Sequence, residues 1–88
     1  MKLAFTRSFA KDLQQIRENF VLERLQEVIH EIEAAVSIQA LKNLKKLSSE
    51  SRHYRLRIGD YRLGLVIEAD IITFVRILHR KDIYRYFP

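Results

Sequence analysis

The chain has 88 residues, of which 48% are hydrophobic and 31% charged, a balance typical of a small folded domain rather than a disordered segment. It has no cysteine, which excludes disulfides and thiolate chemistry, and its three histidines lack the spacing of metal ligands. No segment has the features of a signal peptide or approaches membrane-spanning length. We therefore expect one cytoplasmic domain over residues 1–88, with no cofactor, no metal and no membrane partner.

The positive charge is concentrated in the second half of the chain. Residues 1–51 carry a net charge of +1 and residues 52–88 a net charge of +4, which together give the total of +5. The sequence pI is about 9.8. Cations gathered on one part of a small domain are typical of a protein that binds a phosphate backbone or an acidic protein partner.

The first half of the sequence predicts a strand followed by two amphipathic helices. Residues 2–5 alternate as a short strand would, and Thr6 is a candidate N-cap. Apolar residues at helical spacing predict a first helix ending near Asn19 and a second from about Leu22 to Val36. Three leucines at three-residue spacing predict a further helical turn or two between residues 37 and 47. The apolar faces are Phe9, Leu13, Ile16 and Phe20 in the first helix, and Leu22, Leu25, Ile29, Ile32 and Val36 in the second.

Residues 52–67 predict a β-hairpin. Cations and apolar residues alternate at the period of a strand on both sides of Gly59 and Asp60. A two-residue loop with glycine first would fix the register of the two strands. That register opposes Ile58 to Tyr61, Arg57 to Arg62, Leu56 to Leu63 and Arg55 to Gly64. One face of the hairpin is then apolar, and the other carries three arginines without a carboxylate between them.

The opposition of Arg57 to Arg62 is a poor arrangement for stability alone, because like charges directly across two strands repel. A bound polyanion would relieve this repulsion. A solvated outer face is the ordinary role of single charged residues on a half-buried sheet. With three arginines on one face and no carboxylate between them, a binding surface has the same weight as this ordinary role.

Residues 71–78 predict a third strand of the same sheet, and the last residues a short helical turn and a tail. A two-residue turn after the hairpin would bury Arg76 and expose Ile77. A three-residue turn or a bulge would instead place Arg76 and Arg80 on the arginine face, with Val75 and Ile77 against the helices. We favour the second arrangement, because it does not bury Arg76 without a partner. The expected fold is α+β, a small, mainly antiparallel sheet with two N-terminal helices on one face.

Two segments resemble a known family. YRLRIGDYRL at 54–63 and ILHRKDIY at 77–84 are similar to the hairpin and the closing element of the RelE branch of the RelE/ParE toxin superfamily. The resemblance implies the toxin of a type II toxin-antitoxin pair, a ribosome-dependent, metal-independent endoribonuclease that cleaves mRNA in the decoding site. It also implies a cognate antitoxin, expected to be acidic, that wraps the toxin.

Residue by residue, the resemblance assigns catalytic positions to Arg55, Arg57, Arg62, His79, Arg80 and Tyr84. Six further cations are candidates for RNA contacts: Lys42, Lys45, Lys46, Arg52, Arg76 and Lys81.

Metal-free RNA cleavage needs a base for the 2′-hydroxyl, cations for the phosphorane and an acid for the leaving 5′-oxygen. Arginine suits the second task, because its planar fork donates two hydrogen bonds to one phosphate. It cannot serve as the base, since it stays protonated, and relatives are thought to use lysine at the hairpin positions that are Arg55 and Arg57 here. His79 is the best remaining proton acceptor, although the favoured strand register turns it away from the arginine face. Tyr84 could stack on a base or donate a proton.

Two other functions stay open from the sequence. A ParE-like protein would inhibit DNA gyrase by binding and would perform no RNA chemistry. A catalytically weak RNA-binding domain would account for the missing hairpin lysines. The arginine-rich hairpin with His79, Arg80 and Tyr84 favours the nuclease.

Overall fold

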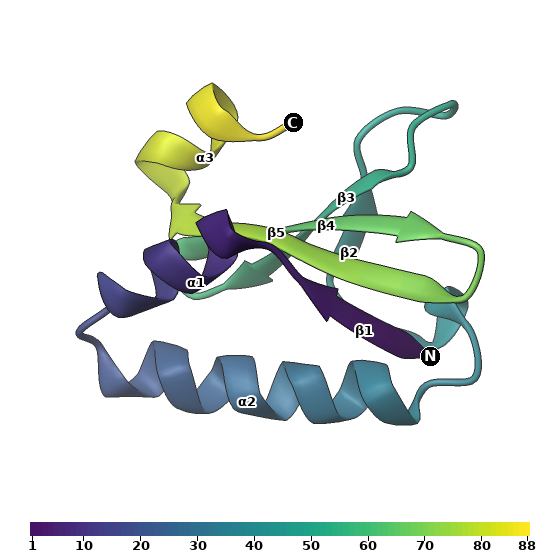
Figure 1. Cartoon of the computed structure of the whole chain (residues 1–88), viewed down its shortest axis with the longest axis horizontal. Coiled ribbons are helices and arrows are strands. Elements are labelled where there is room, and N and C mark those ends of the chain that lie inside the picture. Colours follow the sequence, from purple (N-terminus) through teal and green to yellow (C-terminus); the bar gives the residue numbers. More distant parts are fainter.

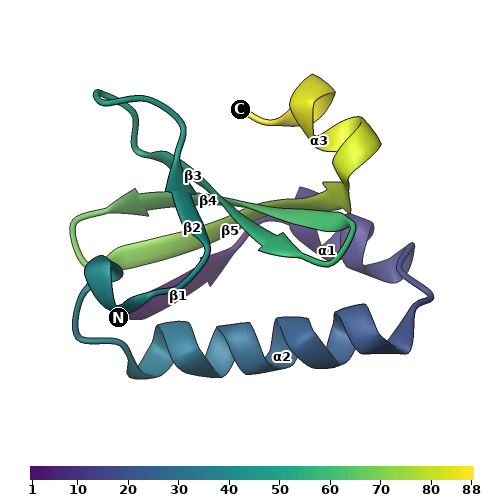
Figure 2. The same cartoon turned by 180° about the vertical axis from the view of Figure 1, so that it is seen from behind.

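The computed structural model describes all residues, 1–88, and has a five-stranded sheet between two layers of helix (Figures 1 and 2). The strands are ordered β1-β5-β4-β3-β2, and only the β1–β5 pair is parallel. In chain order the elements are β1 (Lys2–Phe5), α1 (Arg7–Gln14), α2 (Asn19–Ala34), a 3₁₀ turn (Ile38–Ala40), β2 (Leu44–Lys46), β3 (His53–Ile58), β4 (Tyr61–Glu68), β5 (Ile71–His79) and α3 (Arg80–Tyr86). The predicted α+β fold is confirmed.

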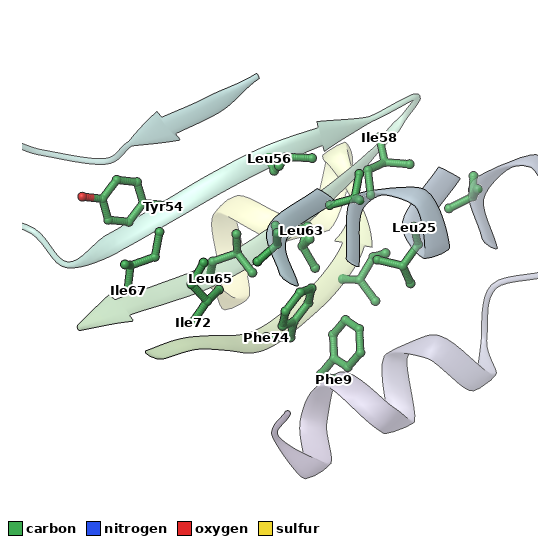
Figure 3. Packing of buried hydrophobic residues seen from close by; sticks show 14 of the residues in the cluster. Phe9, Leu25, Tyr54, Leu56, Ile58, Leu63, Leu65, Ile67, Ile72 and Phe74 are labelled. Carbon is green, nitrogen blue, oxygen red and sulfur yellow. The ribbon is translucent and has the colours of Figure 1, made fainter. Parts of the chain in front are cut away.

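The main core lies between the sheet and the two N-terminal helices. Phe9 of α1 contacts Phe74 of β5 edge to face, with 5.5 Å between ring centres, and α2 covers β3 with Leu25 (Figure 3). Aliphatic and aromatic side chains of both layers are buried together, so their removal from water is the main stabilising term. Thr6 caps α1, because its hydroxyl accepts a hydrogen bond from the Phe9 amide at 3.0 Å.

The hairpin has the predicted register. Ile58 pairs with Tyr61, and the opposition of Arg57 to Arg62 follows from it. Gly59 begins the two-residue loop at φ +58°, a backbone region that favours glycine. The predicted apolar face is the core face of these strands: Tyr54, Leu56, Ile58, Leu63, Leu65 and Ile67 are buried, and Tyr61 is half-buried.

A bulge in β5 sets the direction of Arg76. Gly64 pairs with Arg76, but Leu65 pairs with Phe74, so Val75 is the extra residue. The turn after β4 has two residues, and the bulge restores the orientation that we favoured. Ile77 is buried in the core, and Arg76 lies on the arginine face. Val75 is only half-buried, so its predicted place against the helices is wrong.

The C-terminal helix α3 covers part of the arginine face. Ile83 and Phe87 are buried there, outside the main core. The Phe87 ring fits directly over Gly64, where a Cβ would stand only 2.8 Å from its Cγ. The protein therefore has a small second core between α3 and the sheet, and the site is confined to the rest of this face.

The boundaries of the two N-terminal helices differ from the prediction. α1 ends at Gln14 rather than near Asn19, and Ile16 turns into the core from the connection. Phe20 belongs to the start of α2 and is 61% exposed. α2 ends at Ala34, which leaves Val36 outside the helix and exposed. The buried stripe of α2 is Val21, Leu25, Val28 and Ile32.

The prediction of a helical turn or two between residues 37 and 47 holds for the 3₁₀ turn Ile38–Ala40 and is wrong for the residues that follow it. Residues 44–46 form strand β2, which pairs antiparallel with β3 after Asn43 turns the chain at φ +63°. The leucine spacing fitted a helix, but pairing with the open edge of β3 satisfies the backbone groups instead. Such long-range pairing is not visible in local periodicity. None of the helices is long and apolar enough to cross a membrane.

The packing of Phe87 on Gly64 can be tested by substitution. Gly64→Ala should lower the free energy of unfolding by about 1–3 kcal/mol, because the added methyl overpacks the second core. Urea denaturation measures this change. In a Phe87→Ala background the same alanine should cost little, since the ring that it meets is gone. An equal cost in both backgrounds would contradict the packing.

Candidate functional site

The three hairpin arginines line one cleft on the face opposite the main core. Arg55, Arg57 and Arg62 share this cleft of about 320 Å³ with Asn43, Lys45 and Tyr84. Alternation places the arginine side chains together, because Arg55 and Arg57 have the same parity on β3, and Arg62 opposes Arg57. No carboxylate lines the cleft, so its charge is positive throughout. We call it the arginine cleft.

Strand β2 adds a lysine to the arginine cleft. Lys45 pairs directly with Arg55 across the β2–β3 ladder, and side chains of opposed residues lie on the same face. The sequence suggested Lys45 only as a peripheral RNA contact on a helical turn. Asn43 was missed altogether. The only sequence signal for this placement is the short segment Leu44–Lys46, which is too short to reveal a strand by alternation.

Tyr84 stacks on Arg55 from the opposite side of the cleft. The guanidinium carbon of Arg55 lies 4.5 Å from the centre of the Tyr84 ring, a cation–π distance. The Arg55 Nε is buried and makes no hydrogen bond within the protein. Tyr84 itself is 66% exposed. The stacking therefore fixes Arg55 and leaves the tyrosine accessible to a ligand.

Arg62 is bonded to backbone rather than to an acid. Its Nη1 donates to the carbonyl oxygens of Gly59 and Tyr61, both at 3.0 Å. These bonds hold the guanidinium near the turn of the hairpin without neutralising its charge. Arg57, directly across the ladder, is exposed and makes no ion pair. The repulsion between the two is thus unrelieved within the protein.

His79 does not lie in the arginine cleft. Its Nδ1 accepts a hydrogen bond from the Lys81 amide at 3.1 Å, so the side chain caps α3. Its ring packs edge to face with Tyr61, with 5.7 Å between ring centres. Arg80 also lies outside the lining, at the hairpin turn, where its Nε is 3.9 Å from Asp60 Oδ1. Neither of these two predicted catalytic residues lines the arginine cleft.

Arg76 is held by a buried carboxylate. Asp12 of α1 accepts hydrogen bonds from Arg76 Nε at 2.7 Å and from Nη2 at 2.9 Å, and a third from the Ile77 amide at 3.1 Å. The hydrogen bonds to Asp12 raise the pKa of Arg76. The ring of Tyr86 lies 5.5 Å from the guanidinium carbon. The structure thus places Arg76 in a pair that joins α1, β5 and α3, not in the cleft predicted to bind RNA.

The other cations suggested as RNA contacts are scattered around the molecule. Lys46 projects towards Tyr54 on the helix-covered face, with its Nζ 5.9 Å from the ring centre. Arg52 pairs with Glu68 at 3.0 Å. Lys42 lines a different cleft, beside the end of α2, and Lys81 is exposed in the first turn of α3. Of the six candidates, only Lys45 reaches the arginine cleft.

The sheet has two helices on one face and, on the other, a cationic cleft beside a closing helix. The family model for the ParE toxin of the type II toxin-antitoxin system, parDE, matches residues 3–84. The chain belongs to this family of type II toxins.

Known toxins resemble this chain in sequence and in fold. Toxin RelE3 of Methanocaldococcus jannaschii is 39% identical over 89 residues, which cover all of both chains. The toxin-type fold also occurs in the crystal structure of the RelB–RelE antitoxin–toxin complex from Methanococcus jannaschii, at 37% identity and a TM-score of 0.80 over 97% of this chain and 99% of that one. The archaeal RelE–RelB complex from Pyrococcus horikoshii OT3 shares the fold at 20% identity and a TM-score of 0.72, over 90% and 93% of the two chains.

The capping role of His79 predicts a loss of stability when the cap is removed. His79→Ala should lower the free energy of unfolding by about 0.5–2 kcal/mol and speed hydrogen exchange of the Lys81 amide. His79→Asn should recover most of the loss, because asparagine is a good N-cap. Unchanged stability and unchanged exchange in His79→Ala would show that the imidazole does not cap α3.

Proposed function

We propose that this protein is a metal-independent endoribonuclease that cleaves mRNA in the decoding site of the ribosome. The observation that carries the proposal is the arginine cleft: three guanidinium groups and one amine converge where no carboxylate neutralises them. The name RelE of two similar proteins agrees with this function. The cleft offers positive charge for a phosphate and, in Lys45 and Tyr84, groups that exchange protons.

The arginines are suited to the charge that develops during cleavage. When the 2′-oxygen attacks, negative charge grows on the non-bridging oxygens of the phosphorane. Guanidinium groups fixed before the reaction stabilise this charge without reorganising. Arg55 is fixed by Tyr84, and Arg62 by the turn carbonyls. Arg57, which no carboxylate holds, completes the set.

Lys45 takes the role of proton acceptor that the hairpin arginines cannot fill. The Lys45 side chain accepts the proton of the 2′-hydroxyl, and the 2′-oxygen then bonds to phosphorus. The bond from phosphorus to the 5′-oxygen breaks, and this oxygen takes the proton of the Tyr84 hydroxyl. The products are a 2′,3′-cyclic phosphate and a 5′-hydroxyl. The geometric support is the place of both residues on the walls of the arginine cleft.

A cognate antitoxin is the second partner that we propose. RelE proteins of two archaea were crystallised with RelB antitoxins. The net charge of +5 favours an acidic partner for this chain. An antitoxin that covers the arginine cleft would block RNA, so inhibition needs no change in the fold of the toxin.

A gyrase inhibitor is the alternative function, because the matching family model is named for ParE. Such a protein needs a binding surface but no proton-transfer groups. Ribosomes programmed with a defined message, with mapping of the mRNA ends, separate the two functions when a gyrase supercoiling assay is run beside them. Cleaved message with unaffected gyrase is the expected outcome; inhibited gyrase with intact message would contradict the proposal.

Arg62→Ala should abolish cleavage, because it removes one of the three groups that stabilise the phosphorane. The variant should unfold within about 0.5 kcal/mol of the wild type, since the side chain is outside both cores. Arg17→Ala removes the same charge from an exposed position elsewhere and is the matched control. Full cleavage by Arg62→Ala, measured with programmed ribosomes, would refute the role of the cleft.

Lys45→Arg separates charge from proton transfer. The substitution keeps a cation in the cleft, so binding to the ribosome should persist, whereas single-turnover cleavage should fall by about 10²–10⁴-fold. Lys46→Arg, on the neighbouring residue that faces away, should cleave like the wild type. If Lys45→Arg retains the wild-type rate, Lys45 is not the proton acceptor.

A further inference from the structure

A second cationic cleft continues from the arginine cleft towards α2. It has a volume of about 510 Å³ and is lined by Arg24, Asn43, Arg57, Ile58 and Gly59. Asn43 and Arg57 line both clefts, so the two are continuous. Strand β2 pairs only as far as Leu56, which leaves the following residues of β3 on an open sheet edge. No carboxylate lines this second cleft.

An exposed aromatic ring lies beside Gly59, one of the residues that line the second cleft. Phe20 is 61% exposed, and its ring lies so close to Gly59 that a Cβ there would meet Cε2 at 3.0 Å. Phe20 is not part of the main core, although its spacing in the sequence predicted a buried position. Arg24 follows one helical turn later on the same side of α2. The helix thus presents a ring and a cation beside the hairpin turn.

Arg24 keeps donors available for a ligand. It pairs with Glu27 at 3.4 Å and with Glu31 at 3.1 Å, and both contacts use Nη1. The other guanidinium nitrogens of Arg24 make no hydrogen bond within the protein. The two glutamates therefore orient the guanidinium and reduce its charge without consuming its remaining donors.

We infer that the second cleft binds a nucleotide next to the one that is cut, with its base stacked on Phe20 and its phosphate between Arg57 and Arg24. This inference rests on the proposed function, because it extends the same RNA strand. Aromatic side chains stack on unpaired bases of any sequence, and Arg57 would contact the phosphates on both of its sides. The subsite would position the strand, whereas the chemistry stays in the arginine cleft.

The surroundings favour RNA over a protein segment as the occupant. The cleft is continuous with the site proposed for the scissile phosphate, and its lining is cationic with one aliphatic side chain. A helix of a partner protein would need an apolar groove, and Phe20 is the only large exposed hydrophobic residue of α2. A single ring flanked by arginines matches the stacking platforms of single-stranded RNA sites.

A double-mutant cycle between protein and message tests the subsite. The half-saturating toxin concentration for single-turnover cleavage is measured on ribosomes whose message carries, in turn, an abasic site at each nucleotide beside the cut. For the wild type, one abasic position should raise this concentration about tenfold, the loss of one base stack. Phe20→Ala should show the same rise on the intact message and no further rise with that abasic site.

Two variants serve as controls. Phe20→Tyr keeps a ring and should bind like the wild type, and Val36→Ala removes another exposed apolar side chain and should have no effect. If Phe20→Ala has the same half-saturating concentration as the wild type on the intact message, the subsite is refuted. It is also refuted if the effects of Phe20→Ala and of the abasic site multiply when the two are combined. Normal cleavage by Phe20→Ala with weakened antitoxin binding would assign the ring to the protein interface and overturn it equally. A wild type that cuts no message would refute the proposed function itself.

Discussion

The register of the β3–β4 hairpin is the constraint on which the rest of the structure depends. Because side chains alternate along a strand, one choice of register sends the core-forming apolar residues to the helices and three arginines to the opposite face. A slip by one residue would bury the cations and expose the core. The two-residue loop that joins the strands needs a positive φ at Gly59, a backbone conformation that residues other than glycine adopt poorly. Stability of the fold and assembly of the site therefore have the same origin.

The remaining elements turn this arginine face into a cleft. The bulge at Val75 lets Arg76 reach Asp12 while Ile77 stays in the core. Helix α3 is anchored over Gly64 by Phe87 and brings Tyr84 onto Arg55. Strand β2 forms the opposite wall. The arginines on this face are therefore not all neutralised in the same way. Arg76 pairs with the carboxylate of Asp12. The arginines of the cleft have no carboxylate within the protein, and a bound phosphate would neutralise them best.

The features that depend on local alternation could be predicted from the sequence. The features that depend on contacts between distant segments could not. Hairpin register, buried face and fold class follow from the period of two and the Gly59 turn. The strand that carries Lys45 could not be predicted, because three residues show no period and its partner lies in another segment. The same applies to Arg76, whose partner Asp12 is 64 residues away in sequence. His79 was chosen for its chemistry, but its backbone position made it a helix cap.

The convergence of the cleft arginines on one phosphate can be observed directly by NMR. The Nε–H resonances of the arginines are followed while a 2′-O-methyl RNA, which cannot be cleaved, is added. The account predicts that Arg55, Arg57 and Arg62 shift together and saturate at one RNA concentration, while Arg76 stays unchanged in its pair with Asp12. Movement of Arg76 with the three cleft resonances unchanged would contradict the account.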